Sequence, residues 1–147
     1  REGRGSSMDT PRASLDDTKK KVLVVDDESG TVLILTKHFE GMGFEVVSAF
    51  DGLAALAAVR QTRPDLIVLD RMMPKMDGLK VCAMLKSDKR FKDIPIIMAT
   101  ASADRATQQL SEELGANVFV NKPLNMAEIS SAVRKLLGLE EPPPVSG

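Results

Sequence analysis

The sequence predicts an α/β protein with a doubly wound, five-stranded parallel sheet. Five short apolar runs alternate along the chain with longer segments in which apolar residues recur at helical spacing. The runs are mostly continuous rather than interrupted by polar residues, and strands of this kind are covered by helices on both faces. Strands that alternate with helices favour parallel pairing, because a crossover helix connects each strand to the next.

The five predicted strands are the apolar runs that lie between turn-forming residues. Their sequences are KVLVV, EVVSA, LIVL, IPIIMAT and NVFV, at residues 21–25, 45–49, 66–69, 94–100 and 117–120. Pro95 lies at the entry of the fourth strand, where a missing backbone N–H is tolerated.

Predicted helices fill the intervals after each strand. They span residues 30–43, 53–61, 78–86, 103–115 and 125–138. In the first helix four apolar residues recur at helical spacing, namely Val32, Leu35, Phe39 and Met42. The second helix ends before Pro64, and Gly115 ends the fourth. Asn125 begins the last helix, with Glu128 three positions later as in a capping box.

The chain of 147 residues is long enough for one ordinary domain. Residues 1–20 contain almost no large apolar side chains, so we expect a disordered arm or a cloning remnant there, since REGRGSS precedes a methionine. The folded domain is expected over residues 21–139. Residues 140–147 are expected to form a Pro-rich tail or the start of a linker.

Composition excludes several classes of protein. Lys and Arg (20) nearly balance Asp and Glu (21), so the basic excess of a nucleic-acid-binding domain is missing. Cys82 is the only cysteine, which excludes an internal disulfide and favours a reducing, cytoplasmic location. No apolar run approaches the roughly 18 residues of a membrane span. We therefore expect neither membrane contact nor direct nucleic-acid binding.

Polar side chains gather where the predicted strands end. Asp26 and Asp27 follow the first strand, Asp70 follows the third, Thr100 ends the fourth and Lys122 follows the fifth. The carboxyl ends of parallel strands share one edge of a sheet, and open α/β sheets bind ligands there. Carboxylates held close together repel one another, and a divalent cation relieves this repulsion. Because hard oxygen ligands suit Mg²⁺ better than zinc, the pattern predicts a magnesium site.

These residues also have ordinary structural explanations. Asp26 or Asp27 could cap the following helix, Thr100 could be structural, and Lys122 could simply be solvated. A capping role is weak for Asp70, because the next helix begins only near residue 78. The coincidence of all five at one edge favours a functional site. We assign structural roles to His38 and Cys82, and expect Met72, Met73 and Met76 to pack within their loop.

Four motifs together resemble the response-regulator receiver domain of bacterial two-component signalling. They are VVDDE at 24–28, D-x-x-M-P-x-M-D-G at 70–78, T-A at 100–101 and F-V-N-K-P at 119–123. The motifs extend over the folded unit in the order and spacing of that family. The resemblance implies a flavodoxin-like (βα)5 receiver fold.

The resemblance also implies a role for each residue of the predicted edge. Asp70 would be the phosphoacceptor, which takes a phosphoryl group from a phosphohistidine. Asp26, Asp27, Asp70 and the backbone carbonyl of Met72 would hold Mg²⁺. Lys122 and Thr100 would contact the phosphoryl oxygens, and Thr100 with Phe119 would form a switch. That switch would alter the face made by helix 103–114, strand 117–120 and helix 125–138.

The partners that the resemblance implies are a sensor histidine kinase or phosphotransfer protein upstream, and a target or fused output domain downstream. The chain would be a monomer or a phosphorylation-dependent dimer. It would be a signalling domain rather than an enzyme, catalysing only its own phosphorylation and dephosphorylation. K-P-L at 122–124 replaces the K-P-F frequent in DNA-binding regulators, a faint argument against that subgroup. Met72 and Ser102 are poorly suited to orient a hydrolytic water, so slow loss of the phosphoryl group is expected.

Two other functions stay open at this point. A haloacid-dehalogenase-like phosphatase also uses an aspartate nucleophile and Mg²⁺, but that family has D-x-D-x-T/V after its first strand, where this chain has DDESG. A receiver fold that only binds partners, without phosphorylation, is the other alternative. Such proteins usually lack one of three features: the complete pair of acidic residues after the first strand, the acceptor aspartate, or the lysine. This chain has all three.

Overall fold

The computed structural model describes residues 19–101 and 104–139. It contains one five-stranded parallel sheet with the strand order β2-β1-β3-β4-β5, which confirms the predicted fold class. The strands are β1 (Lys21–Val25), β2 (Glu45–Ala49), β3 (Leu66–Leu69), β4 (Ile96–Thr100) and β5 (Val118–Asn121). The predicted arm over residues 1–20, apart from its last two residues, and the tail over 140–147 lie outside the described residues.

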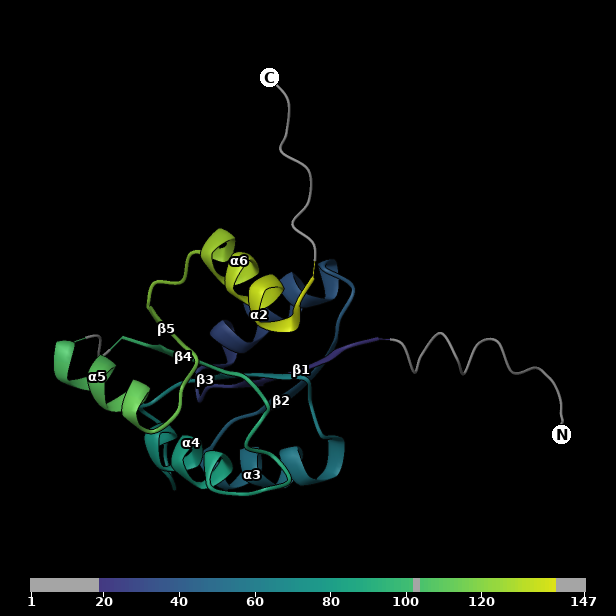
Figure 1. Cartoon of the computed structure of the whole chain (residues 1–147). Helices are drawn as coiled ribbons and strands as arrows, with labels where there is room; N and C mark the ends of the chain where they lie inside the picture. Colours follow the sequence, from purple (N-terminus) through teal and green to yellow (C-terminus); the bar gives the residue numbers. More distant parts are fainter. Residues whose placement is uncertain (1–18, 102–103, 140–147) are drawn as a thin grey trace, which may run out of the picture.

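Helices cover both faces of the sheet (Figure 1). They are α2 (Ser29–Gly41), α3 (Gly52–Thr62), α4 (Gly78–Lys86), α5 (Arg105–Glu113) and α6 (Met126–Leu137). Helices α2 and α6 lie on one side, and α3 and α4 lie on the other, while α5 lies beside the end of the sheet formed by β4 and β5 (Figure 1). None of the helices in the described part of the chain is long and apolar enough to cross a membrane.

Each face of the sheet has its own apolar cluster, because successive strand residues point to opposite sides. From β1, Leu23 and Val25 join the cluster under α3 and α4. Val22 and Val24 join the cluster under α2 and α6. All four side chains are buried. Burial on both faces explains why the strands read as continuous apolar runs.

The helix ends agree closely with the sequence prediction. The Asn125 side chain accepts a hydrogen bond from the backbone N–H of Glu128 (3.0 Å) at the start of α6. Gly115, two residues after α5, has a φ of 106°, which only glycine adopts readily. Strand β4 begins later than predicted, at Ile96, because Pro95 has no N–H to contribute to the ladder.

From β1 the sheet grows in two directions: β2 pairs on one side, and β3, β4 and β5 follow on the other. The carboxyl ends of β1 and β3 therefore form the topological switch point of the sheet. In the parallel register Val25 lies beside Leu69. The residues that follow them are Asp26 and Asp70, and the Asp70 N–H donates to the Val25 carbonyl (3.0 Å). Strand pairing by itself therefore brings these two carboxylates to one place.

Candidate functional site

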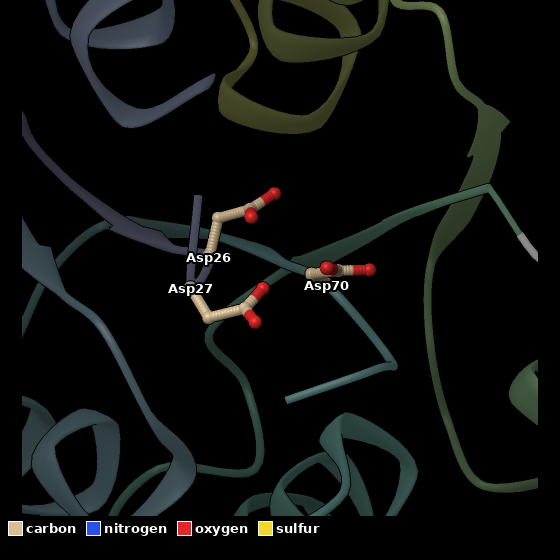
Figure 2. Close-up of side chains that lie close together, drawn as sticks. All are labelled: Asp26, Asp27 and Asp70. Carbon is tan, nitrogen blue, oxygen red and sulfur yellow. The ribbon is translucent and has the colours of Figure 1, made fainter. Parts of the chain in front are cut away.

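Three aspartates meet at the carboxyl edge of the sheet. One carboxylate oxygen from each of Asp26, Asp27 and Asp70 lies within 4.8 Å of the others. Figure 2 shows the side chains leaving neighbouring strand ends, two from the segment after β1 and one from the end of β3. Asp26 and Asp70 are only 2% and 5% exposed, whereas Asp27 faces solvent. The site is thus buried on one side and open on the other.

The structure also shows that neither Asp26 nor Asp27 caps a helix. The N-cap residue of α2 is Glu28, and its side chain makes no capping hydrogen bond. Asp26 instead accepts a hydrogen bond from the backbone N–H of Glu28 (2.9 Å). The capping explanation is therefore wrong, and the carboxylates of Asp26 and Asp27 are directed to the site rather than to the helix.

Lys122 provides the positive charge at this edge. Its Nζ lies 2.6 Å from Asp26 Oδ2 and 3.4 Å from Asp70 Oδ2, so the ammonium group is shared between two buried carboxylates. A backbone hydrogen bond from the Lys122 N–H to the Thr100 carbonyl (3.0 Å) holds this residue beside the end of β4. The peptide bond from Lys122 to Pro123 is cis. Lys122 thus pairs most closely with Asp26, a preference that the sequence did not reveal.

Thr100 ends β4 and is fully buried. With Asp70 and Lys122 it lines a cavity of about 260 Å³, whose other lining residues are Asp27, Glu28, Met72 and Ala101. All five side chains that were predicted from the strand ends are therefore brought to one site. The cavity has room for a small anionic group beside the carboxylates.

The negative charge of the Asp70 carboxylate is only partly compensated by its surroundings. Burial raises the pKa of Asp70, the charge of Asp26 raises it further, and the nearby Lys122 offsets only part of this effect. Asp70 Oδ1 is buried and has no hydrogen-bond partner among the described residues. Burial alone lowers the pKa of Lys122, but hydrogen bonding to Asp26 and the charge of Asp70 raise it overall. An unpartnered carboxylate oxygen among three acidic groups fits a hard divalent cation.

The loop after Asp70 is held against the site by glycine contacts. A Cβ atom on Gly78 would lie 2.8 Å from the Asp70 carbonyl carbon and 2.9 Å from Arg71 Cα. The Gly78 N–H donates to the Arg71 carbonyl (2.8 Å), which closes the loop. The φ of Gly78 is not positive, so a left-handed backbone conformation is not what requires glycine here. Glycine is needed at this position for close approach.

The turn within this loop falls on Lys75. That residue has a φ of 71°, and the Met76 N–H donates to the Pro74 carbonyl (2.8 Å) across it. A three-residue turn with positive φ at its centre is rare and strained. Met73 and Met76 were expected to pack within their loop, and they pack on the apolar cluster under α3 and α4. Met72 does not, because its side chain is 58% exposed.

Phe119 lies half-buried on β5, packed against the cluster under α3 and α4. In the register of the sheet it is beside Met98, two residues before Thr100 on β4.

Of the residues assigned structural roles, Cys82 is buried within α4. His38 Nε2 lies 2.7 Å from Ser130 Oγ, which connects α2 to α6. Ser102 lies outside the described residues.

Two residues of this region were missed by sequence reasoning. Glu28, the last letter of VVDDE, lies with Oε1 3.4 Å from Lys122 Nζ. Arg71, next to Asp70, donates from Nη1 to Thr107 Oγ1 on α5 (2.6 Å). A charged residue directly after a strand-end aspartate was the available signal for Arg71. Its partner lies 36 positions along the chain and could not be read from a local pattern.

Comparisons with known proteins agree with this geometry. A family model described as the response regulator receiver domain matches residues 22–134. The probable transcriptional regulator ycf27 of Cyanophora paradoxa is 45% identical over 128 residues, which are 87% of this chain and 52% of that protein. The alkaline phosphatase synthesis transcriptional regulatory protein PhoP of Bacillus subtilis is 41% identical over 122 residues, which are 83% of this chain and 50% of that protein. This chain thus spans about half the length of these relatives.

Among solved structures, a putative response regulator from Chloroflexus aurantiacus superposes with a TM-score of 0.79 at 30% sequence identity. The alignment covers 82% of this chain and 99% of that one. A match of this extent shows that the two chains share one fold.

The glycine contact predicts that Gly78→Ala destabilises the protein by about 1–3 kcal/mol, because its Cβ would overlap backbone atoms that cannot move away independently. Urea unfolding would measure this change. Gly30→Ala is the matched control: it lies in α2 with no atom within 4 Å of the new Cβ. It should be neutral or stabilising by up to about 1 kcal/mol. Equal stability of the two variants would contradict the close-approach explanation.

The raised pKa of Asp70 predicts that Asp70→Asn is more stable than the natural protein at pH 7 without metal. Protonation of Asp70 is favoured in the folded state, so the natural protein loses stability as the pH rises above about 4 and the carboxyl ionises. The advantage of the variant should fade as the pH falls below that range. Thermal unfolding across pH 3–8 in the presence of a chelator would test this.

Asp51→Asn is the control for the Asp70 comparison. The Asp51 side chain caps α3, and its pKa is lowered chiefly by the hydrogen bond from the Ala54 N–H. Its replacement should therefore give no gain at pH 7. A natural protein that is more stable than Asp70→Asn at pH 7 would show that Lys122 outweighs burial and the charge of Asp26.

Proposed function

Because this chain belongs to the response regulator receiver family, we propose that it is a phosphoacceptor switch in which Asp70 takes a phosphoryl group from a phosphohistidine. The donor would be a sensor histidine kinase or a phosphotransfer protein. The observation that carries the proposal is the position of Asp70: a buried carboxylate at the switch point of the sheet, with two further aspartates and one lysine around it.

In the transfer, an oxygen of Asp70 attacks phosphorus and an O–P bond forms. The P–N bond of the phosphohistidine breaks, and its electron pair stays on the imidazole nitrogen. Transfer of this kind depends on positioning and on cancelling charge at the phosphoryl oxygens. The cavity that Asp70 shares with Thr100 and Lys122 has an open side through which a donor imidazole could approach.

The residues fit Mg²⁺ as the cation, held by Asp26, Asp27, Asp70 and the backbone carbonyl of Met72. When bound, the ion would favour the ionised, nucleophilic form of Asp70 and would offset charge on the phosphoryl oxygens. Asp27 is the one exposed ligand of the aspartate group and would meet the ion first from solvent.

Lys122 would act on the phosphoryl group by changing partner. Its Nζ is 0.8 Å nearer to Asp26 (2.6 Å) than to Asp70 (3.4 Å) before transfer. Phosphorylation adds roughly 1.5–2 negative charges at Asp70. The ammonium group would therefore shift toward the phosphoryl oxygens, while the metal compensates the charge of Asp26.

Thr100 and Phe119 would carry the signal away from the site. The Thr100 hydroxyl would be drawn to a phosphoryl oxygen, and Phe119, already half-buried beside Met98, would move into the vacated space. This change would alter the face made by α5, β5 and α6. We propose that face as the contact surface for the downstream partner or for a phosphorylation-dependent dimer.

The output of the full-length protein is a separate part of the proposal. Both relatives described above are named as transcriptional regulators, and this chain spans only about half of each. Their names favour a fused output domain that controls transcription. Leu124, in the K-P-L motif, argued faintly in the other direction, and the relatives carry more weight because they match over most of the chain.

The test of this function is Mg²⁺-dependent phosphorylation by acetyl phosphate or phosphoramidate, followed by intact-mass measurement. We expect the natural chain to gain one phosphoryl group and Asp70→Asn to gain none. In calorimetry, Asp27→Ala should bind Mg²⁺ at least about tenfold more weakly than the natural chain. Asp51→Asn removes a nearby carboxylate outside the aspartate group and should behave like the natural chain.

Each contrary result has a distinct meaning. Failure of both donors to label the natural chain would favour an interaction domain that works without phosphorylation. Sustained turnover of p-nitrophenyl phosphate would favour a phosphatase. Equal Mg²⁺ affinity of Asp27→Ala and the natural chain would remove Asp27 from the metal site.

The switch predicts that Thr100→Ala still accepts the phosphoryl group but loses the phosphorylation-dependent NMR shifts around Phe119. The reason is that movement of the Thr100 hydroxyl toward the phosphoryl group is what would vacate the space into which Phe119 moves. Ser48→Ala, which removes an exposed hydroxyl from β2 on the far side of the sheet, is the control and should keep the shifts. Full shifts in Thr100→Ala would rule out this coupling.

A further inference from the structure

Helix α5 is attached to the fold differently from the other helices. Its buried residues are Thr107 and Ser111, and no residue of α5 is a member of either buried apolar cluster. Its leucine within the helix, Leu110, is 41% exposed. The other helices each bury at least two apolar side chains. Only the C-cap residue Leu114 packs against an apolar cluster, so the rest of α5 depends on polar contacts to an unusual degree.

The main polar contact comes from the residue next to Asp70. Arg71 Nη1 donates to Thr107 Oγ1 at 2.6 Å, and Thr107 is 4% exposed. The Thr107 backbone N–H donates to the side chain of Asp104 (2.7 Å), which is the N-cap residue of α5. A continuous chain of hydrogen bonds thus runs from the phosphoacceptor loop to the first turn of α5.

The Arg71 guanidinium is incompletely satisfied in this arrangement. Its Nε is buried and makes no hydrogen bond within the part of the chain that the structure describes. The nearest carboxylate oxygen, on Asp77, is 3.6 Å away, too far for a good hydrogen bond. A buried donor without a partner is costly. The guanidinium is therefore able to gain by changing its partners when a stronger acceptor appears.

We propose that Arg71 is a positioning residue that holds α5 in its resting position through Thr107, and that phosphorylation of Asp70 weakens this contact. The inference rests on the proposed function of Asp70. A phosphoryl group adds negative charge and three acceptor oxygens on the residue that precedes Arg71. Charge-assisted bonds to such a group are stronger than a bond to a neutral hydroxyl. This route to α5 is separate from the one through Thr100 and Phe119.

Linkage gives the proposal a measurable consequence. A contact that exists only in the resting state opposes binding of a phosphoryl mimic, so its removal must raise the affinity for that mimic. A coupling of ordinary size corresponds to a gain of about fivefold or more. A purely structural contact, present equally in both states, would leave the affinity unchanged.

The experiment compares the Thr107→Val and Ser111→Ala variants of the 147-residue chain. Thr107→Val keeps the shape and the overall charge but removes the acceptor for Arg71. Ser111→Ala is the matched control, because its buried hydroxyl donates only to the Thr107 carbonyl within α5. Two quantities are measured by NMR: hydrogen exchange of the α5 amides without metal, and affinity for beryllofluoride with Mg²⁺.

We expect Thr107→Val to speed α5 amide exchange about tenfold and to bind beryllofluoride at least about fivefold more tightly than the natural chain. Ser111→Ala should keep the natural affinity. Arg71→Ala should speed exchange to the same extent, and the double variant with Thr107→Val should exchange no faster than either single one.

Unchanged or weaker beryllofluoride binding by Thr107→Val would overturn the proposal, as would additive exchange effects of the two single variants. Failure of the natural chain to bind beryllofluoride at all would contradict the proposed function instead. In that case the metal-free exchange rates still test whether the Arg71–Thr107 contact holds α5. If the α5 amides of Thr107→Val exchange as slowly as those of the natural chain, the contact does not hold the helix.

Discussion

The pairing of β1 with β3 places two buried carboxylates side by side, and much of the site is organised around the resulting repulsion. Val25 and Leu69 are in register, so Asp26 and Asp70 must leave the sheet at the same point. Their charges oppose each other in a place from which water is largely excluded. Lys122 relieves part of this opposition, but among the residues that the structure describes Asp70 Oδ1 has no hydrogen-bond partner. The folded protein thus holds a site whose charge is unbalanced until a cation or a proton enters.

The loop after Asp70 keeps this unbalanced site in place. Gly78 lets the loop return against the backbone of Asp70 and Arg71, and Gly52 lets it rest on the start of α3, where a Cβ would lie 2.6 Å from Met76. The positive φ of Lys75 is tolerated because both ends of the loop are fixed. Apolar packing of Met73 and Met76 anchors the same segment to the core. The acidic site and the apolar core are therefore joined by close backbone contact.

Stability is distributed unevenly around the sheet. Helices α2, α3, α4 and α6 contribute apolar side chains to two dense clusters, whereas the buried residues of α5 are the polar Thr107 and Ser111. A helix held mainly by hydroxyl and guanidinium contacts opens at lower free energy than one held by a buried apolar stripe. Elements that move during signalling come from this weaker part of a fold. The weak attachment of α5 lies on the face where we place partner binding, so low local stability and signalling coincide there.

The sequence alone determined the strands, the parallel sheet and the gathering of Asp26, Asp27, Asp70, Thr100 and Lys122 at one edge. Those features follow from apolar runs and from the rule that parallel strands end together, both of which are readable locally. Only the tertiary structure decided that Lys122 pairs first with Asp26, that Gly78 serves close approach, and that Arg71 reaches Thr107. Each of these depends on distances between segments far apart in the chain and on side-chain rotamers. The periodicity of a sequence contains neither.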